Sequence, residues 1–251
     1  MVKSLAAAAL LGLATGMSPT AAATAAELKV LAGGSMTASL KELGPKFEAA
    51  TGHKFDMTFA ATPELIKMAT SAPFDLGVVP VDVLKNDAAR AKFADASPTN
   101  VARVGYGVAV KAGAATPDVS TPEALTATLL KAQSIAVFPA SAAGAFVQKT
   151  FERLGVAQQI KDKLKAQAAP SAIPQAVAKG EAELGVFLTN VLIAPGVELA
   201  GPFPGDLQQD LVFVGAVASD SKNADAAKAF LDYLKTPEAV GVFKAKGITP
   251  G

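Results

Sequence analysis

The stretch LKVLAGGSMTASLKELGPKFEAATG, residues 28–52, decides the fold class of this chain of 251 residues. It begins with a short apolar run, residues 28–31, that is typical of a buried strand. Two glycines follow, and then apolar residues three and four apart predict a helix that Ser35 caps and Gly52 ends. A strand that leads through a tight turn into an amphipathic helix is the repeating unit of α/β proteins. The segment therefore predicts an α/β fold.

The same alternation continues along the rest of the chain. Further strands are expected at residues 54–59, 76–79, 104–110, 134–138, 184–188 and 211–217. Helices are expected between most of these strands, with one near 158–164, and two more end the chain at 223–235 and 237–244. The pattern predicts mixed or largely parallel sheets flanked by helices. The pair Gly44-Pro45 should kink or split the first helix. Residues 194–205, rich in proline and glycine, are expected to form a loop or linker.

Composition excludes several classes of function. The chain has 23 Lys and Arg, 22 Asp and Glu, one His and no Cys. Near-zero net charge supplies no basic field for nucleic acid, so no nucleic-acid partner is expected. The absence of Cys and the single His exclude zinc-thiolate and multi-histidine metal sites, so no metal ligand is predicted. No catalytic residue is predicted either, because no nucleophile-elbow, dinucleotide or P-loop motif is found.

The first 26 residues have the pattern of a secretory signal peptide. Lys3 precedes an apolar run at residues 5–13, and small residues lead to a cleavage site near Ala26. The run is shorter than the about 20 residues that a membrane-spanning helix needs. Cleavage would remove Lys3 and leave equal numbers of acidic and basic side chains. We expect an exported protein, free in the periplasm and not inserted in the membrane.

Hydroxyl residues stand at several predicted turns from strand to helix. They are Ser35, Thr62 and Ser141, and Ser171 precedes a further helix. Their neighbours are small, which would let main-chain N–H groups approach a ligand; these neighbours are Gly33, Gly34, Ala60, Ala61, Ala142, Ala143 and Gly144. Ligands of open α/β sheets bind beyond the carboxyl ends of strands, and helix N-termini favour anions. The pattern predicts an uncharged anion site, although each residue alone also fits an ordinary helix cap.

Two charged or titratable residues leave alternatives open. Arg103, before a predicted strand, either lines a cleft or forms a surface ion pair. His53 is the one side chain with an ordinary pKa near neutrality, so an exported hydrolase or transferase would need it beside Ser35 or Thr62. We expect His53 instead to be distant from them and to face solvent.

Five fragments, in order and at matching spacing, resemble the periplasmic molybdate-binding protein family of ABC importers. They are LKVLAGGSMT (28–37), FEAATG (47–52), APFDLGVV (72–79), GEAELGV (180–186) and AFLDYLKTPEA (229–239). The resemblance implies the type II periplasmic binding-protein fold, a monomer whose two lobes close on a ligand in the cleft between them. On this resemblance, residues 27–106 and 208–251 would form lobe 1, and residues 107–207 would form lobe 2.

The resemblance also implies which residues would contact the ligand. The family holds its oxyanion with hydroxyls and main-chain amides, and the corresponding positions here are Gly34, Ser35, Ala61, Thr62, Ser141, Ala142, Ala143, Ser171 and Leu188. Leu188 stands where the family has a tyrosine, and Pro170 occupies an amide-donor turn without an N–H group. Thr189, Asn190 or Arg103 could replace the lost donors, and Arg103 would favour a carboxylate.

The leading hypothesis is a periplasmic solute-binding protein that binds a small oxyanion, of the molybdate or tungstate type, and needs no cofactor. It would deliver the ligand to a membrane permease with its ATPase. The alternatives are a small organic anion on the same scaffold, an exported hydrolase or transferase, and a sensor that reports to a membrane receptor.

Overall fold

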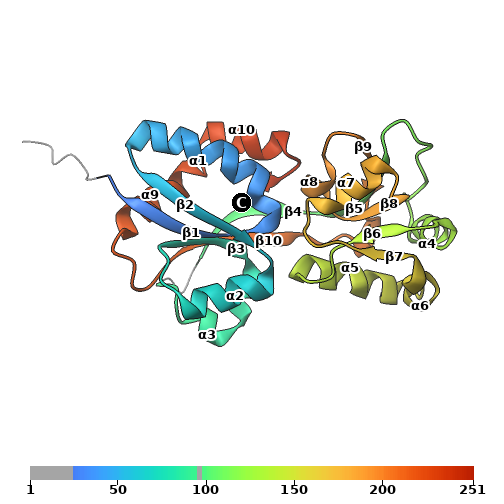
Figure 1. Ribbon diagram of the computed structural model, residues 1–251, viewed down its shortest axis with the longest axis horizontal. Coiled ribbons are helices and arrows are strands. Elements are labelled where there is room, and N and C mark those ends of the chain that lie inside the picture. Colours follow the sequence, from blue (N-terminus) through green and yellow to red (C-terminus); the bar gives the residue numbers. More distant parts are fainter. Residues whose placement is uncertain (1–24, 95–97) are drawn as a thin grey trace, which may run out of the picture.

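A computed structural model describes residues 25–94 and 98–251. The signal peptide predicted for residues 1–26 lies, apart from its last two residues, outside the described residues. Among the residues described, no helix combines the length and the apolar character that crossing a bilayer requires. The described chain forms two lobes side by side, each with a sheet between helices (Figure 1). This confirms the predicted two-lobed α/β fold class.

The first lobe is built on a six-stranded sheet in the order β11-β4-β10-β3-β1-β2. Its strands are β1 (Glu27–Gly33), β2 (Lys54–Ala60), β3 (Leu76–Pro80), β4 (Thr99–Val104), β10 (Leu211–Val217) and β11 (Thr249–Pro250). Strand β1 pairs in parallel with β2 and β3, whereas β10 runs antiparallel to β3 and β4. The helices are α1 (Thr37–Thr51), α2 (Thr62–Ser71), α3 (Asp87–Arg90), α9 (Ala224–Tyr233) and α10 (Pro237–Ala245).

The second lobe has a five-stranded sheet in the order β7-β6-β8-β5-β9. Its strands are β5 (Tyr106–Lys111), β6 (Ile135–Val137), β7 (Leu164–Ala166), β8 (Leu184–Leu188) and β9 (Val197–Pro202). Strand β6 is parallel to β7 and β8, and β5 is antiparallel to β8 and β9. The helices are α4 (Pro122–Lys131), α5 (Ala142–Arg153), α6 (Ala157–Ile160), α7 (Ala172–Lys179) and α8 (Thr189–Leu192).

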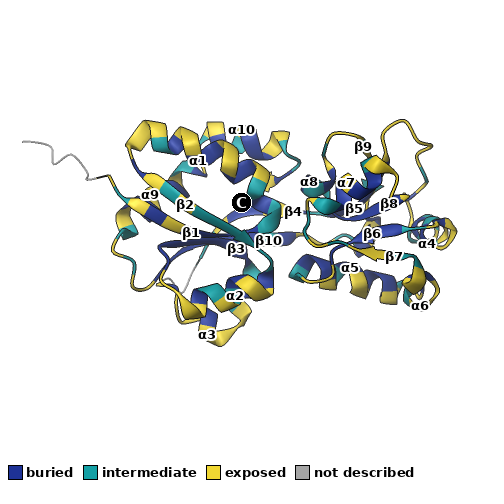
Figure 2. Cartoon of the chain, viewed as in Figure 1, coloured by how far each residue is buried: buried dark blue, intermediate teal, exposed yellow. Residues whose placement is uncertain are grey.

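Helices cover both faces of the central strands. In the first lobe α1 and α10 lie on one face, and α2 and α3 lie on the other (Figure 1). Strands β3 and β8 are buried along their whole length, and exposed residues concentrate on the outer sides of the helices (Figure 2). Strands covered on both faces must be apolar throughout, which is why the sequence pattern located them.

Four sequence expectations are corrected by the structure. Helix α1 continues through Pro45, which lies on its exposed side, where water can satisfy the carbonyl group that proline leaves unbonded. The expected single strand 104–110 belongs to two strands in different sheets, because the chain crosses between the lobes there. The expected loop 194–205 contains β9, and the expected helix 158–164 covers most of α6, a 3-10 turn and the start of β7.

The chain crosses between the lobes twice, at Gly105 and at residues 203–210. The side chain of Gln208 joins the two crossings, since its Oε1 accepts from the N–H of Tyr106 at 2.8 Å and its Nε2 donates to the Tyr106 carbonyl at 2.9 Å. A Cβ atom at position 105 would lie 3.0 Å from Gln208 Nε2, so glycine permits this approach. The boundary between the lobes was expected after residue 106. Tyr106 instead belongs to the sheet of the second lobe, so this boundary lies one residue earlier.

We expect Gln208→Ala to lower the free energy of unfolding by about 1–3 kcal/mol, because it leaves the main-chain N–H of Tyr106 at the hinge without a partner, while the Tyr106 carbonyl still accepts from the N–H of Phe203. Chemical denaturation measures the change. The matched control is Gln209→Ala, at an exposed neighbouring position. Equal stability of the two variants would contradict the hinge role of Gln208.

Candidate functional site

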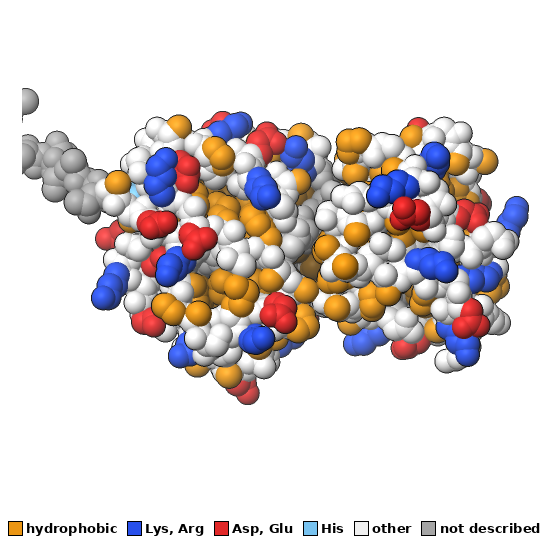
Figure 3. Space-filling view, viewed as in Figure 1, with side chains coloured by type: hydrophobic (Ala, Val, Ile, Leu, Met, Phe, Trp, Pro, Cys, Tyr) orange, Lys and Arg blue, Asp and Glu red, His pale blue; other side chains and the backbone are white. Residues whose placement is uncertain are grey.

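The two lobes face each other across a cleft, visible as a groove in the surface (Figure 3). A small cavity of about 20 Å³ lies within it, where β1, β2 and β8 end. We call this cavity, with the turns that line it, the cradle. The first lobe contributes Gly33, Gly34, Ser35, Ala60, Ala61, Thr62, Pro80 and Leu211, and the second contributes Phe138, Ser141, Ala143, Pro170, Phe187 and Leu188. Most of the residues that the sequence pointed to are therefore brought together from turns far apart in the chain.

The first lobe contributes two hydroxyl groups. Ser35 lies inside a 3-10 turn, Gly34–Met36, that precedes α1, so the expectation that it caps the helix is wrong. Thr62 is the first residue of α2, and Ala61 occupies the cap position instead. The Thr62 hydroxyl accepts from the N–H of Ala142 in the other lobe, with 3.3 Å between nitrogen and oxygen. Neither hydroxyl donates a hydrogen bond to another described residue, so each keeps its hydrogen for a ligand.

The start of α5 contributes donors from the second lobe. The Ser141 hydroxyl caps this helix by accepting from the N–H of Gly144 at 3.0 Å, as expected, and its own hydrogen stays available. The N–H of Ala142 points to Thr62, whereas the N–H of Ala143 has no hydrogen-bond partner among the described residues. An unpaired N–H at the N-terminus of a twelve-residue helix favours a negative charge.

The remaining side of the cradle is apolar. Leu188 ends β8, opposite Tyr106 in the antiparallel register, and its side chain is fully buried. Pro170 faces Gly34 of the other lobe, where a Cβ atom would lie 3.6 Å from the proline ring. Ser171 precedes α7 but makes no side-chain cap, and it lines the two larger cavities next to the cradle. Leu188 and Pro170 thus form an apolar wall where the resemblance implied further donors.

The lobes are joined above the cradle by two hydrogen bonds. Besides the bond between Ala142 and Thr62, Asn190 Nδ2 donates to the main-chain carbonyl of Ser35 at 2.8 Å. Asn190 is buried, and its Oδ1 atom has no hydrogen-bond partner within residues 25–94 and 98–251. The sequence indicated Asn190 only as a possible replacement donor, and the structure places it beside Ser35.

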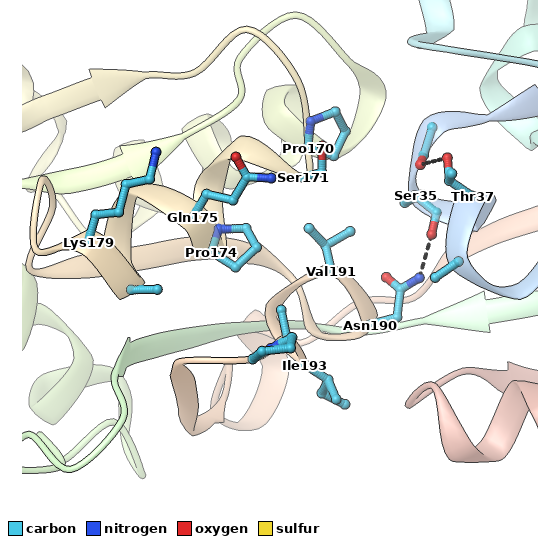
Figure 4. A pocket seen from close by; sticks show the side chains of 15 residues that line it. Ser35, Thr37, Pro170, Ser171, Pro174, Gln175, Lys179, Asn190, Val191 and Ile193 are labelled. Atoms are coloured by element: carbon cyan, nitrogen blue, oxygen red, sulfur yellow. Dashed lines mark hydrogen bonds between the residues drawn. The ribbon is translucent and has the colours of Figure 1, made fainter.

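Two larger cavities adjoin the cradle. One, of about 600 Å³, lies between the start of α1 and the helices α7 and α8, and Figure 4 shows Gln175 and Lys179 on α7 facing the same side as Ser171. The other, of about 500 Å³, includes Glu64 in its lining. Gln175 and Lys179 were not predicted from the sequence, because a polar residue every four positions also describes an ordinary exposed helix face.

Arg103 and His53 lie away from the cradle. Arg103 is exposed on β4, where it pairs with Val212 and Thr249 in the sheet, and it lines neither the cradle nor its adjoining cavities. His53 directly precedes β2, whereas the cradle lies at the other end of this strand. At the usual rise per residue the two ends are about 20 Å apart. The expectation of a solvent-facing His53 is wrong: it is 8% exposed, because its Nδ1 accepts from the N–H of Ala26 and its ring stacks on Phe47.

The cradle therefore offers several hydrogen-bond donors, and no side-chain cation is among the described residues that line it. The donors include the hydroxyls of Ser35, Thr62 and Ser141 and the N–H of Ala143. The main-chain N–H groups of the first-lobe turns, at Gly34, Ser35, Ala61 and Thr62, likewise have no hydrogen-bond partner in the described part of the chain. Donors of this kind suit an anion, because each presents positive charge density to it and none is itself charged.

Comparison with known proteins gives consistent results. The sequence profile of the family described as bacterial extracellular solute-binding protein matches residues 28–249. An aconitate isomerase from Pseudomonas sp. is 31% identical over 89% of this chain and 87% of its own length. The molybdate-binding protein ModA of Azotobacter vinelandii is 30% identical over 90% of this chain and 91% of its own length.

The fold comparison points the same way. A solved structure of the Azotobacter vinelandii periplasmic molybdate-binding protein superposes with a TM-score of 0.74 and 18% identity, covering 89% of this chain and 99% of that one. The resemblance to molybdate-binding proteins is thereby confirmed. With its profile match over nearly all described residues, the chain belongs to the bacterial extracellular solute-binding protein family.

Proposed function

We propose that this protein is the periplasmic solute-binding subunit of an ABC importer and that its cradle captures the carboxylate group of a small organic anion. The protein would act as a monomer and deliver its ligand to a permease driven by an ATPase. The signal peptide expected at residues 1–26, cleaved near Ala26, would place it in the periplasm. Relatives named as molybdate-binding proteins support the transport role.

The donor set of the cradle carries this proposal. A carboxylate has two oxygen atoms with about four lone-pair sites. The cradle offers the hydroxyls of Ser35, Thr62 and Ser141 and the N–H of Ala143, and the main-chain N–H groups of its first-lobe turns also have no hydrogen-bond partner among the described residues. These donors are enough to serve every site on a carboxylate.

A free oxyanion of the molybdate or tungstate type is the second candidate, supported by the relatives named for molybdate. Its four oxygen atoms need more donors than a carboxylate does. Leu188 and Pro170 supply none from their side chains, and Pro170 has no N–H group. A buried acceptor without a donor costs about 1–3 kcal/mol, so the donor set favours the organic anion.

Binding is a better interpretation than catalysis. The three cradle hydroxyls have no carboxylate, imidazole or amine within hydrogen-bond distance among the described residues. General-base chemistry needs such a group within reach of the proton that it removes. One relative is nevertheless named aconitate isomerase, which makes a direct activity test worthwhile.

We expect isothermal titration to show binding of small carboxylates such as succinate, malate and citrate. Molybdate, tungstate, sulfate and phosphate should bind at least about 10-fold more weakly, a difference of about 1.4 kcal/mol. Tighter binding of molybdate or tungstate would favour the second candidate. Failure of all these anions to bind would reject the proposed anion site.

Removing a cradle hydroxyl should weaken carboxylate binding. Ser35→Ala and Thr62→Val each delete one hydrogen bond to a charged group, worth about 1.5–3 kcal/mol, which corresponds to about 10- to 150-fold in Kd. The control is Ser71→Ala, at an exposed position whose hydroxyl bonds only to Lys67 within α2. Unchanged affinity in both cradle variants would contradict the assigned donors.

Incubation with cis-aconitate should leave its isomer composition unchanged beyond the blank reaction, as measured by chromatography. The reason is the absence of a base beside the cradle hydroxyls among the described residues. Protein-dependent isomerisation that disappears in Ser35→Ala would overturn the interpretation as a binding protein without catalytic activity.

A further inference from the structure

We infer that the signal peptide is cut between Ala25 and Ala26 and that the amino group released by this cut binds to His53. This rests on the proposed function, because only an exported chain meets the peptidase that removes a signal peptide. His53 is a largely buried side chain that the cradle does not use. Binding the new N-terminus would be its role in the mature protein.

The sequence offers two peptide bonds for this cut. Ala23-Thr24-Ala25 and Thr24-Ala25-Ala26 both have small residues at the two positions that the peptidase recognises. A cut after the first triplet makes Ala26 the first residue of the mature chain, whereas a cut after the second makes it Glu27. Because both triplets fit, the choice between them depends on what residue 26 does in the folded protein.

Ala26 has the contacts of a structural residue. Its N–H donates to His53 Nδ1 at 3.1 Å, and its carbonyl accepts from the N–H of Lys54 at 2.8 Å. Its methyl group packs, partly buried, against the hydrophobic core. Ala25 is exposed, and no hydrogen bond of its main chain is found among the described residues. A cut after Ala26 would remove all three contacts, whereas a cut after Ala25 removes none of them.

The His53 ring is held so that its Nδ1 atom faces Ala26. His53 is 8% exposed, and its ring stacks on Phe47 with 5.9 Å between the ring centroids. Within residues 25–94 and 98–251, Ala26 supplies the one hydrogen bond that Nδ1 accepts. A largely buried acceptor that loses its donor destabilises the folded chain. The fold therefore favours the mature chain that keeps Ala26.

Cleavage after Ala25 also changes the chemistry of this contact. Hydrolysis adds water across the peptide bond, so that the C–N bond breaks, Ala25 leaves as a carboxylate and the nitrogen of Ala26 becomes an amine. At neutral pH this amine takes up a proton, since neutral pH lies below the ordinary pKa of an α-amino group. Hydrogen bonds from a charged donor are roughly twice as strong as neutral ones. The cut thus strengthens the bond to His53 Nδ1.

This contact closes one end of a strand pair whose other end forms part of the cradle. Ala26 directly precedes β1 and His53 directly precedes β2, and the two strands pair in parallel along their whole length. Their last residues, Gly33 and Ala60, line the cradle. The new N-terminus would thus fasten the end of the strand pair that is remote from the ligand.

The cleavage site is tested by producing the full chain in a Gram-negative bacterium. The intact mass and the N-terminal sequence of the protein in the periplasmic fraction are then measured, and we expect a chain that starts at Ala26. A chain that starts at Glu27, or at any other residue, would overturn the inference while export stands. A chain that stays uncleaved in the cytoplasm would reject the export that the proposed function requires, and the inference fails with it.

The role of His53 is tested with two mature chains, one starting at Ala26 and one at Glu27, each freed from a removable N-terminal fusion. We expect the chain from Glu27 to melt at least about 2 °C lower, a shift typical of one lost hydrogen bond in a chain of this length. His53→Phe keeps an aromatic ring against Phe47 and removes only the acceptor. In this variant the difference between the two chains should fall by about half, because the carbonyl and methyl contacts of Ala26 remain. Equal melting temperatures of the two unsubstituted chains, or an unchanged difference in His53→Phe, would contradict the assigned contact.

Discussion

The two hydrogen bonds between the Gln208 side chain and the main chain of Tyr106 are the constraint on which the relation of the lobes depends. They tie the outgoing crossing to the returning one, so both connections act as a single hinge. The Tyr106 ring packs near Phe146 of the second lobe and Phe203 at the start of the returning crossing, and burial raises the pKa of its hydroxyl, which keeps it neutral. The hinge is therefore anchored in the core of one lobe.

This hinge brings the carboxyl ends of strands from both lobes to one cleft. Each strand end leads into a turn and a helix, so main-chain N–H groups and hydroxyls collect there. Ser35 and Thr62 come from one lobe, and Ser141 and Ala143 come from the other. A site divided in this way is completed only when the lobes approach, and two bonds across the cleft, from Ala142 and Asn190, hold them in the described arrangement.

The uncharged cradle agrees with the composition of the chain. A cleft lined by hydroxyls and main-chain amides needs no histidine cluster, cysteine or excess of basic residues. The strand–turn–helix pattern of the sequence is enough to identify most of the cradle lining. It does not identify Lys179 and Gln175, because their spacing describes an exposed helix face as well as the wall of a cavity.

The sequence by itself determined the α/β class, most strands and helices, and the hydroxyls at the turns, because periodicity and capping preferences act between residues a few positions apart. Only the tertiary structure decided that residues 104–110 divide between two sheets at Gly105. It also decided that Ser35 enters a 3-10 turn and that His53 is buried. The contacts that set the cleft join residues 102 positions apart for Tyr106 and Gln208 and 155 apart for Ser35 and Asn190. Local patterns carry no information about such pairs, because their proximity results from the packing of whole lobes.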